Sequence, residues 1–229
     1  MIEWRPPNND PMNYLNSKMP ATFSLPGRLA VCCTLLTILL GQSPYHSFAQ
    51  DSLENEPDIN QLMQGKAYIY KLYPEDAAGK GYKLVYMVAA PLSAYWNFKT
   101  DFENNFLLTN KLITEHRLVE YKDNVAITET IYATKPGVRF RWRTISSPDI
   151  HRLDFELLNP KECRQKSNYG HIQLEEIGDH TKVTQIGYFE FFGATLWMNY
   201  PWYGGMHHNL NYTARWEQET IVRLIDKYR

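Results

Sequence analysis

The sequence predicts an α+β domain in which a curved antiparallel sheet of about six or seven strands wraps around a long C-terminal helix. Two short helices are expected after the first strand. Strand patterns follow one another almost without interruption between residues 111 and 193, and the chain then ends in one amphipathic segment without proline. A run of strands must bury one face against another apolar layer, and this last segment is the only large one available.

An apolar run precedes this domain near the start of the chain. Residues 29–40 are apolar or small, Arg28 precedes them, and Ser47-Phe48-Ala49 follows. A basic residue, an apolar segment and a small-x-small segment are typical of a secretory signal peptide. A membrane-spanning helix needs about 20 apolar residues, and this run is shorter. We therefore predict a periplasmic or secreted protein that is cleaved after Ala49, with an uncleaved N-terminal anchor or a buried core helix as alternatives.

This interpretation divides the chain into three parts. Residues 1–49 form the N-terminal extension and signal peptide, residues 50–65 an acidic linker, and residues 66–229 one folded domain. Cys163 is the only cysteine of that domain, so the domain has no internal disulfide. An exported domain of this size without disulfides fits a bacterial periplasm better than a eukaryotic extracellular space.

Two candidate strands and two short helices open the domain. Strand patterns cover residues 67–73 and 82–88, and the second pattern ends at Ala89-Ala90-Pro91. Proline suits the first position of a helix, and an apolar stripe of Leu92, Tyr95, Trp96 and Phe98 follows it. A second short helix is expected over about residues 102–108.

The next part of the chain is typical of strands joined by turns. The expected strands cover residues 111–121, 125–133, 138–145, 151–158, 171–177 and 181–192. Within residues 138–145, arginine occupies positions 139, 141 and 143, and Phe140, Trp142 and Thr144 lie on the other face. Such alternation indicates a sheet with one wet and one dry face. The arginines are expected on the wet face beside acidic side chains; with the faces inverted they would line a cavity and bind an acidic ligand.

One long amphipathic helix closes the chain over residues 206–228. Its apolar residues recur at helical spacing: Met206, Leu210, Ala214, Ile221, Leu224, Ile225 and Tyr228. An antiparallel sheet that curves around such a helix leaves a cavity between the two. Before this helix, the aromatic and glycine-flanked residues 193–205 form either a lid over that cavity or an ordinary buried loop.

The segment Tyr86–Pro91, followed by Trp96 and Asp101, resembles the START-like superfamily, also called the SRPBCC or helix-grip fold. In that family the first strand runs into Ala-Pro, a Trp follows five residues after the proline, and an Asp follows five residues after the Trp. Both spacings are five here. The resemblance extends over residues 66–228 through the order of the elements. One departure is Asn104–Leu108, where many members have a Pro and a second Trp.

This resemblance implies a helix-grip fold with a cavity for a hydrophobic ligand. The family takes in lipid-transfer domains and polyketide cyclase/dehydrase-like proteins, so the fold by itself does not decide between carrier and enzyme.

Composition and motifs exclude several classes of function. The chain has 24 Lys and Arg against 25 Asp and Glu, so no basic surface for nucleic acid is indicated. The sequence contains no phosphate-binding, dinucleotide-binding or zinc-protease motif. His207 and His208 are adjacent, and neighbouring residues of a helix point about 100° apart, so they are poorly placed to share one metal ion. We therefore expect no metal, no cofactor and no nucleic acid partner.

The favoured function is the binding or transfer of a hydrophobic or amphipathic, lipid-like small molecule by an exported protein that can contact a membrane transiently. The residues expected to line the cavity come from the first helix, the dry face of the sheet and the last helix: Trp96, Phe140, Trp142, Phe155, Phe189, Met206, Leu210 and Ala214. The oligomeric state is left open.

Two alternatives belong to other classes of function. An enzyme of the cyclase or dehydratase type would need a titratable group in the cavity, for which Glu129, Asp154 and Glu190 are the candidates, although no catalytic residue is assigned. A partner-binding module would have a filled core and no cavity. The placement of the side chains separates these hypotheses.

Overall fold

The computed structural model describes residues 57–73, 79–133, 135–192 and 205–229. The predicted export signal, its cleavage site and nearly all of the segment expected to form a lid or loop lie outside these residues. Within the described ranges no helix combines the length and the apolar character needed to cross a membrane.

Eight strands and five helical segments make up the described part of the chain. The strands are β1 (Tyr68–Leu72), β2 (Lys80–Val88), β3 (Ile113–Lys122), β4 (Val125–Tyr132), β5 (Arg139–Ser147), β6 (Arg152–Leu157), β7 (Gln165–Ile177) and β8 (His180–Phe191). The α-helices are α1 (Ile59–Met63), α2 (Leu92–Thr100) and α3 (Gly205–Tyr228), and the 3-10 helices are η1 (Asn105–Thr109) and η2 (Pro148–Ile150).

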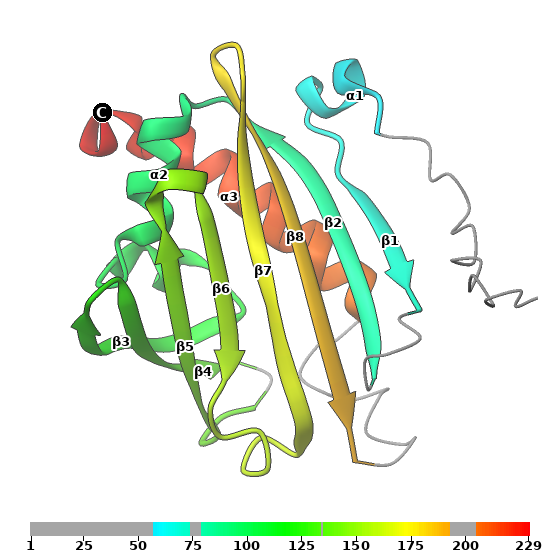
Figure 1. Cartoon of the computed structure of the whole chain (residues 1–229), viewed down its shortest axis with the longest axis vertical. Coiled ribbons are helices and arrows are strands. Elements are labelled where there is room, and N and C mark those ends of the chain that lie inside the picture. Colours follow the sequence, from blue (N-terminus) through cyan, green and yellow to red (C-terminus); the bar gives the residue numbers. More distant parts are fainter. Residues whose placement is uncertain (1–56, 74–78, 134, 193–204) are drawn as a thin grey trace, which may run out of the picture. The chain divides into compact units, whose positions relative to one another are not determined.

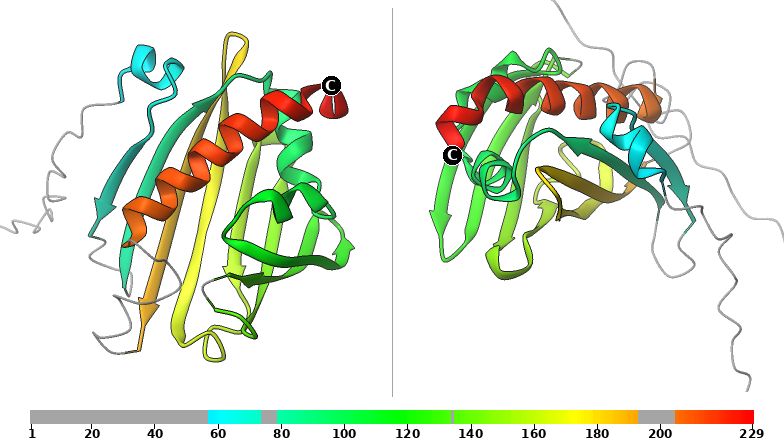
Figure 2. Two further views of the ribbon diagram at one scale, coloured as in Figure 1. Left: turned by 180° about the vertical axis from the view of Figure 1, so that it is seen from behind. Right: turned by 90° about the horizontal axis from the view of Figure 1, so that it is seen from above.

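All eight strands form a single curved sheet in the order β1-β2-β8-β7-β6-β5-β4-β3. Every neighbouring pair of strands is antiparallel. Helix α3 runs obliquely across the concave face, and α2 lies beside its C-terminal end (Figure 1 and Figure 2). The sheet and α3 are therefore the two layers between which any internal site must lie.

The structure confirms the predicted α+β fold but differs from the prediction in three respects. The sheet has eight strands rather than six or seven, because β1 pairs with β2 along its whole length and adds an edge strand. For the same reason the two short helices follow the second strand and not the first. Strand β7 begins at Gln165, well before the predicted start at residue 171, because its early residues pair with the end of β8, Gln165 with Phe191.

The stretch predicted as a linker contains helix α1. The side chain of Asp58 caps this helix by accepting a hydrogen bond of 2.9 Å from the backbone N–H of Asn60. Leu62 is 1% exposed and packs against Val85 and Met87, whose side chains lie on the convex face of β2. Helix α1 within the predicted linker is thus packed on the sheet through Leu62.

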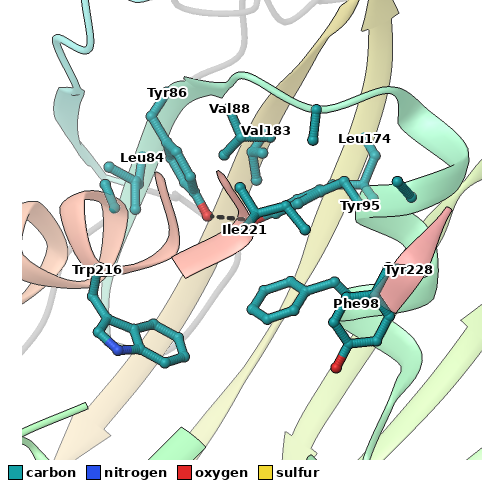
Figure 3. Close-up of a cluster of buried hydrophobic side chains, with 13 residues drawn as sticks. Leu84, Tyr86, Val88, Tyr95, Phe98, Leu174, Val183, Trp216, Ile221 and Tyr228 are labelled. Atoms are coloured by element: carbon teal, nitrogen blue, oxygen red, sulfur yellow. Dashed lines mark hydrogen bonds between the residues drawn. The ribbon is translucent and has the colours of Figure 1, made fainter. Parts of the chain in front are cut away.

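The main hydrophobic core lies between α2, α3 and the strands β2 and β8 (Figure 3). Alternate residues of β2 (Leu84, Tyr86 and Val88) are almost completely buried and point toward α3, where Ile221 is equally buried. The fully buried residues that α3 contributes to this core begin at Ala214, and Leu210 and Tyr212 pack against the same core. Met206, in the first turn of α3, packs instead against a second cluster that contains Phe140 and Phe189 of the sheet.

The arginines of β5 lie on the convex face, so the expected wet face is confirmed. The carboxylate of Glu129 on β4 lies 2.5 Å from Arg117 Nη2, 3.5 Å from Arg139 Nη1 and 3.7 Å from Arg141 Nε. The third arginine of β5 forms an ion pair with a glutamate of β6. The inverted arrangement, with arginines lining a cavity, is therefore wrong.

Candidate functional site

A cavity of about 380 Å³ lies between the concave face of the sheet and the N-terminal part of α3. Strands β2 to β8, the end of α2, the segment around η1 and about three turns of α3 contribute to its wall. The aromatic lining residues are Tyr82, Phe102, Tyr132, Phe140, Trp142, Phe155, Phe189 and Trp216. Volume and lining are those of a site for a small organic molecule.

Six of the eight residues expected to line a cavity are part of its wall. They are Phe140, Trp142, Phe155, Phe189, Met206 and Leu210. The strand residues among them alternate with convex-face residues, as their sequence pattern predicted, and the two helix residues are one turn apart. Contact of these side chains with a ligand stays a prediction.

Trp96 and Ala214 were expected in the cavity wall and lie outside it. Trp96 packs against the main core, and its ring meets the ring of His151 edge-on, with centroids 5.4 Å apart. Ala214 is completely buried, but it packs into the main core with Ile221. The residues of α3 that line the cavity are Met206, Asn209, Leu210, Thr213, Trp216 and Glu217.

A buried carboxylate on α3 is the main polar feature of the site. Glu217 is 4% exposed, and its Oε1 lies 2.9 Å from Lys99 Nζ of α2. Its Oε2 accepts hydrogen bonds from the hydroxyls of Tyr86 on β2 and Tyr95 on α2, whose oxygens are 3.1 Å apart. Figure 3 shows the hydroxyl groups of Tyr86 and Tyr95 meeting beside α3. Lys99 and Glu217 line the cavity, and the tyrosines lie behind them.

The surroundings of Glu217 fix the protonation states of this cluster. Burial alone would raise the pKa of Glu217, but the ammonium of Lys99 and the two hydroxyls outweigh it, and the pKa lies below its usual value. Burial and the negative charge of Glu217 raise the pKa of both Tyr86 and Tyr95 well above 10. The cluster therefore contains one carboxylate, one ammonium and two neutral phenols.

The three acids considered as catalytic candidates lie on the other face of the sheet. Glu129 is held by arginines on the convex face, Asp154 accepts hydrogen bonds from Arg152, and Glu190 pairs with Lys166. None of them is part of the cavity wall. An enzymatic role for these three residues in the cavity is therefore excluded by their position.

His116 lines the cavity, and both of its ring nitrogens have partners. Nε2 lies 3.0 Å from the carbonyl oxygen of Phe102, which can only accept, so Nε2 carries the hydrogen. Nδ1 lies 3.0 Å from Thr130 Oγ1 and accepts from that hydroxyl. Burial lowers the pKa of His116, which keeps the ring neutral at pH 7. This histidine joins β3 and β4 to the segment after α2.

No metal site is visible in the part of the chain that the structure describes. There, no three His, Cys, Asp or Glu side chains lie close enough together to hold an ion. The ring of His207 meets the ring of Tyr82 edge-on at 6.3 Å, and His208 is exposed.

The fold of this chain is similar to that of solved structures, although its sequence matches no family. No protein-family model matches the sequence, and no curated protein matches it. Among solved structures, the Zhui aromatase/cyclase from Streptomyces sp. R1128 is similar, with a TM-score of 0.52 and 11% identity over 69% of this chain and 96% of that one. The chain has the START-like, helix-grip fold. At such low identity the similarity concerns the fold alone.

Two other structures show a weaker likeness to this helix-grip domain. A STAR-related lipid transfer protein from Xanthomonas axonopodis gives a TM-score of 0.47 at 11% identity, over 65% of this chain and 93% of that one. Norcoclaurine synthase from Thalictrum flavum gives a TM-score of 0.48 at 9% identity, over 82% of this chain and 99% of that one.

Two glycines face each other in the middle of the helix-grip sheet, Gly170 on β7 and Gly187 on β8. A Cβ atom at Gly170 would lie 2.0 Å from the carbonyl oxygen of Ile186, so only glycine lets the two strands approach this closely. A Cβ atom at Gly187 would meet only ring carbons of Phe155 and Phe189, at 3.9 and 4.0 Å. Gly187 lines the cavity and leaves space there.

Sequence reasoning missed Glu217, although the sequence of this helix-grip domain contains a signal for it. The apolar stripe of the last helix runs through Leu210, Ala214 and Ile221, and the position between the last two at helical spacing is Glu217. A carboxylate inside an apolar stripe has to find buried partners. Those partners could not be named from the sequence, because Lys99 is 118 residues away.

Proposed function

We propose that this domain binds a hydrophobic or amphipathic small molecule in the cavity between the concave face of the sheet and α3. The observation that carries the proposal is the cavity itself, about 380 Å³ in volume and lined mainly by aromatic side chains. A core that served only stability would be filled at this place, since protein interiors contain few voids larger than a water molecule. Burial of an apolar ligand contributes roughly 25 cal/mol per Å².

The cavity also supports binding over the hypothesis of a filled partner-binding module, which needs no internal space. At the packing density of a protein interior the cavity holds about 15 non-hydrogen atoms. A molecule of one or two rings, or a medium-length chain, fits that size. Such a ligand would contact the rings of Phe140, Trp142, Phe155 and Phe189.

An enzyme remains a second candidate because of one observation. Lys99 and Glu217 form a buried ion pair in the cavity wall, and buried, paired titratable groups in a cavity occur often in active sites. Such pairs also occur for structural reasons. The two roles differ in outcome, since a carrier returns its ligand unchanged and an enzyme converts it.

Native mass spectrometry of the purified protein tests the proposal. The protein is measured as isolated and again after incubation with a mixture of neutral aromatic compounds and medium-chain lipids, and any bound compound is identified by organic extraction. We expect a single added mass in the range of small organic molecules at a ratio of one per chain. A protein that stays at its bare mass in both experiments would contradict the proposed function, and a chemically altered compound would favour the enzyme.

A further inference from the structure

The side chain of Lys99 presents hydrogen-bond donors to the cavity. Its side chain is 14% exposed, and its Nζ contacts Glu217 Oε1 at 2.9 Å. Among the described residues this carboxylate is the only partner of the ammonium. An ammonium has three N–H groups, so Lys99 can donate hydrogen bonds to further acceptors at the cavity wall besides Glu217.

The carboxylate of Glu217 has less capacity left for a ligand than the ammonium, because three of its about four lone-pair sites already accept hydrogen bonds. Its Oε2 accepts from Tyr86 and Tyr95, and its Oε1 accepts from Lys99. Both tyrosines are completely buried in the core behind the cavity. They hold the carboxylate in place, and the carboxylate holds the ammonium at the cavity wall. The polar group that this cluster offers to a ligand is therefore a donor.

The charges that line the cavity are already balanced. In the described part of its wall the charged side chains are Lys99 and Glu217, one of each sign, and they are paired. His116 is neutral, and burial raises the pKa of the lining residue Tyr132 to about 12. An anionic ligand would leave one buried negative charge without compensation, which is very costly, whereas a neutral oxygen acceptor adds no charge.

We propose that the ligand is a neutral molecule with an aromatic or other ring-bearing body and a carbonyl oxygen that accepts a hydrogen bond from Lys99. This inference rests on the proposed function and names the class of ligand. The aromatic wall accommodates the body, and the ammonium of Lys99 anchors the oxygen near the contact of α2 with α3.

Three naphthalene derivatives with the same number of non-hydrogen atoms test this inference by isothermal titration calorimetry. They are 2-acetylnaphthalene, a neutral ketone; 2-naphthoate, an anion; and 2-isopropylnaphthalene, which has no oxygen. Hydrogen bonds to charged groups are among the stronger ones in proteins, so we expect the ketone to bind about tenfold more tightly than the hydrocarbon. The anion is expected to bind more weakly than the ketone by a similar factor.

A variant without the ion pair tests whether Lys99 is the group that donates a hydrogen bond to the carbonyl oxygen of the ligand. Lys99→Met alone would leave Glu217 buried without its counter-charge and could unfold the protein, so the double variant Lys99→Met/Glu217→Gln is used, with similar shape and no charge. We expect its preference for the ketone over the hydrocarbon to fall to less than about threefold.

The possible outcomes are distinct. A ketone preference that persists in the double variant overturns the role of Lys99, and tighter binding of the naphthoate overturns the neutral ligand. Equal binding of all three compounds overturns the inference but leaves the proposed function intact. Failure of all three to bind overturns the inference, and a bare mass in both mass-spectrometry experiments overturns the proposed function as well.

Discussion

Replacing Glu217 by alanine is expected to lower the free energy of unfolding by about 3–5 kcal/mol, the cost of breaking a buried ion pair by removing one partner. The substitution leaves the ammonium of Lys99 without a counter-charge and the hydroxyls of Tyr86 and Tyr95 without their acceptor. These groups come from α2 and β2, so the change affects the contact of α3 with both elements.

Guanidinium chloride unfolding measures this effect, and Glu219→Ala on the same helix is the matched control because Glu219 is exposed. We expect the control to change stability by less than about 0.5 kcal/mol. Equal denaturant midpoints for Glu217→Ala and Glu219→Ala would show that the cluster of Glu217, Lys99, Tyr86 and Tyr95 contributes nothing to stability.

The same cluster predicts a loss of stability in acid. The pKa of Glu217 is lower in the folded state than in the unfolded chain. Its contribution is therefore fully present above the unfolded-state pKa of about 4.3 and is lost as the pH falls through the folded-state pKa. Glu217→Gln should reduce the pH dependence of stability in this acidic range.

The glycine pair of β7 and β8 gives the second large effect. Gly170→Val is expected to cost about 3 kcal/mol or to prevent folding, because its Cβ would lie 2.0 Å from a backbone carbonyl oxygen that cannot move without opening the sheet. Gly187→Val is expected to change stability by less than about 1 kcal/mol, since its Cβ has room and valine favours strands.

Thermal and denaturant unfolding of both glycine variants checks this difference. The two residues are opposite each other in the same strand pair, so each variant is the control for the other. Similar melting of Gly170→Val and Gly187→Val would contradict the close approach of the strands at Gly170.

The elements that depend on local pattern could be predicted from the sequence. The alternation of Arg139 to Thr144 placed the faces of β5 correctly, and the apolar spacing of residues 206–228 predicted α3. The sequence also predicted a strand over residues 67–73, but its place as the edge strand β1 of the same sheet and the early start of β7 depend on pairing with the neighbouring strand. The local pattern does not show where that pairing begins or ends.

The candidate site could be predicted only where side-chain direction follows from strand alternation. That rule placed Phe140, Trp142, Phe155 and Phe189 in the cavity wall. Ala214 belongs to the apolar stripe of α3 but lies on the part of it that faces the core. An apolar stripe wider than the cavity cannot by itself show which of its residues reach the cavity.

The polar part of the site required the three-dimensional structure. Glu217 and Lys99 are ordinary charged residues in sequence, and only the packing of α3 on α2 brings them together. The acids that sequence reasoning favoured, including Glu129, are placed on the convex face by the register of their strands. That register pairs Glu129 with Arg141 and is not encoded in the local pattern.

A bulky side chain that fills the space under α3 shows whether this space holds a small molecule. Leu210→Trp adds volume in the cavity wall, and Val222→Trp adds the same kind of side chain at a position of α3 that is 54% exposed. Fluorescence titration with N-phenyl-1-naphthylamine, a neutral apolar probe, measures binding, and thermal unfolding of each variant confirms that it is folded.

Leu210→Trp is expected to stay folded and to bind the probe about tenfold more weakly or not at all, whereas Val222→Trp is expected to bind it like the unmodified protein. Unchanged probe binding by a folded Leu210→Trp variant would show that no ligand occupies the space under α3.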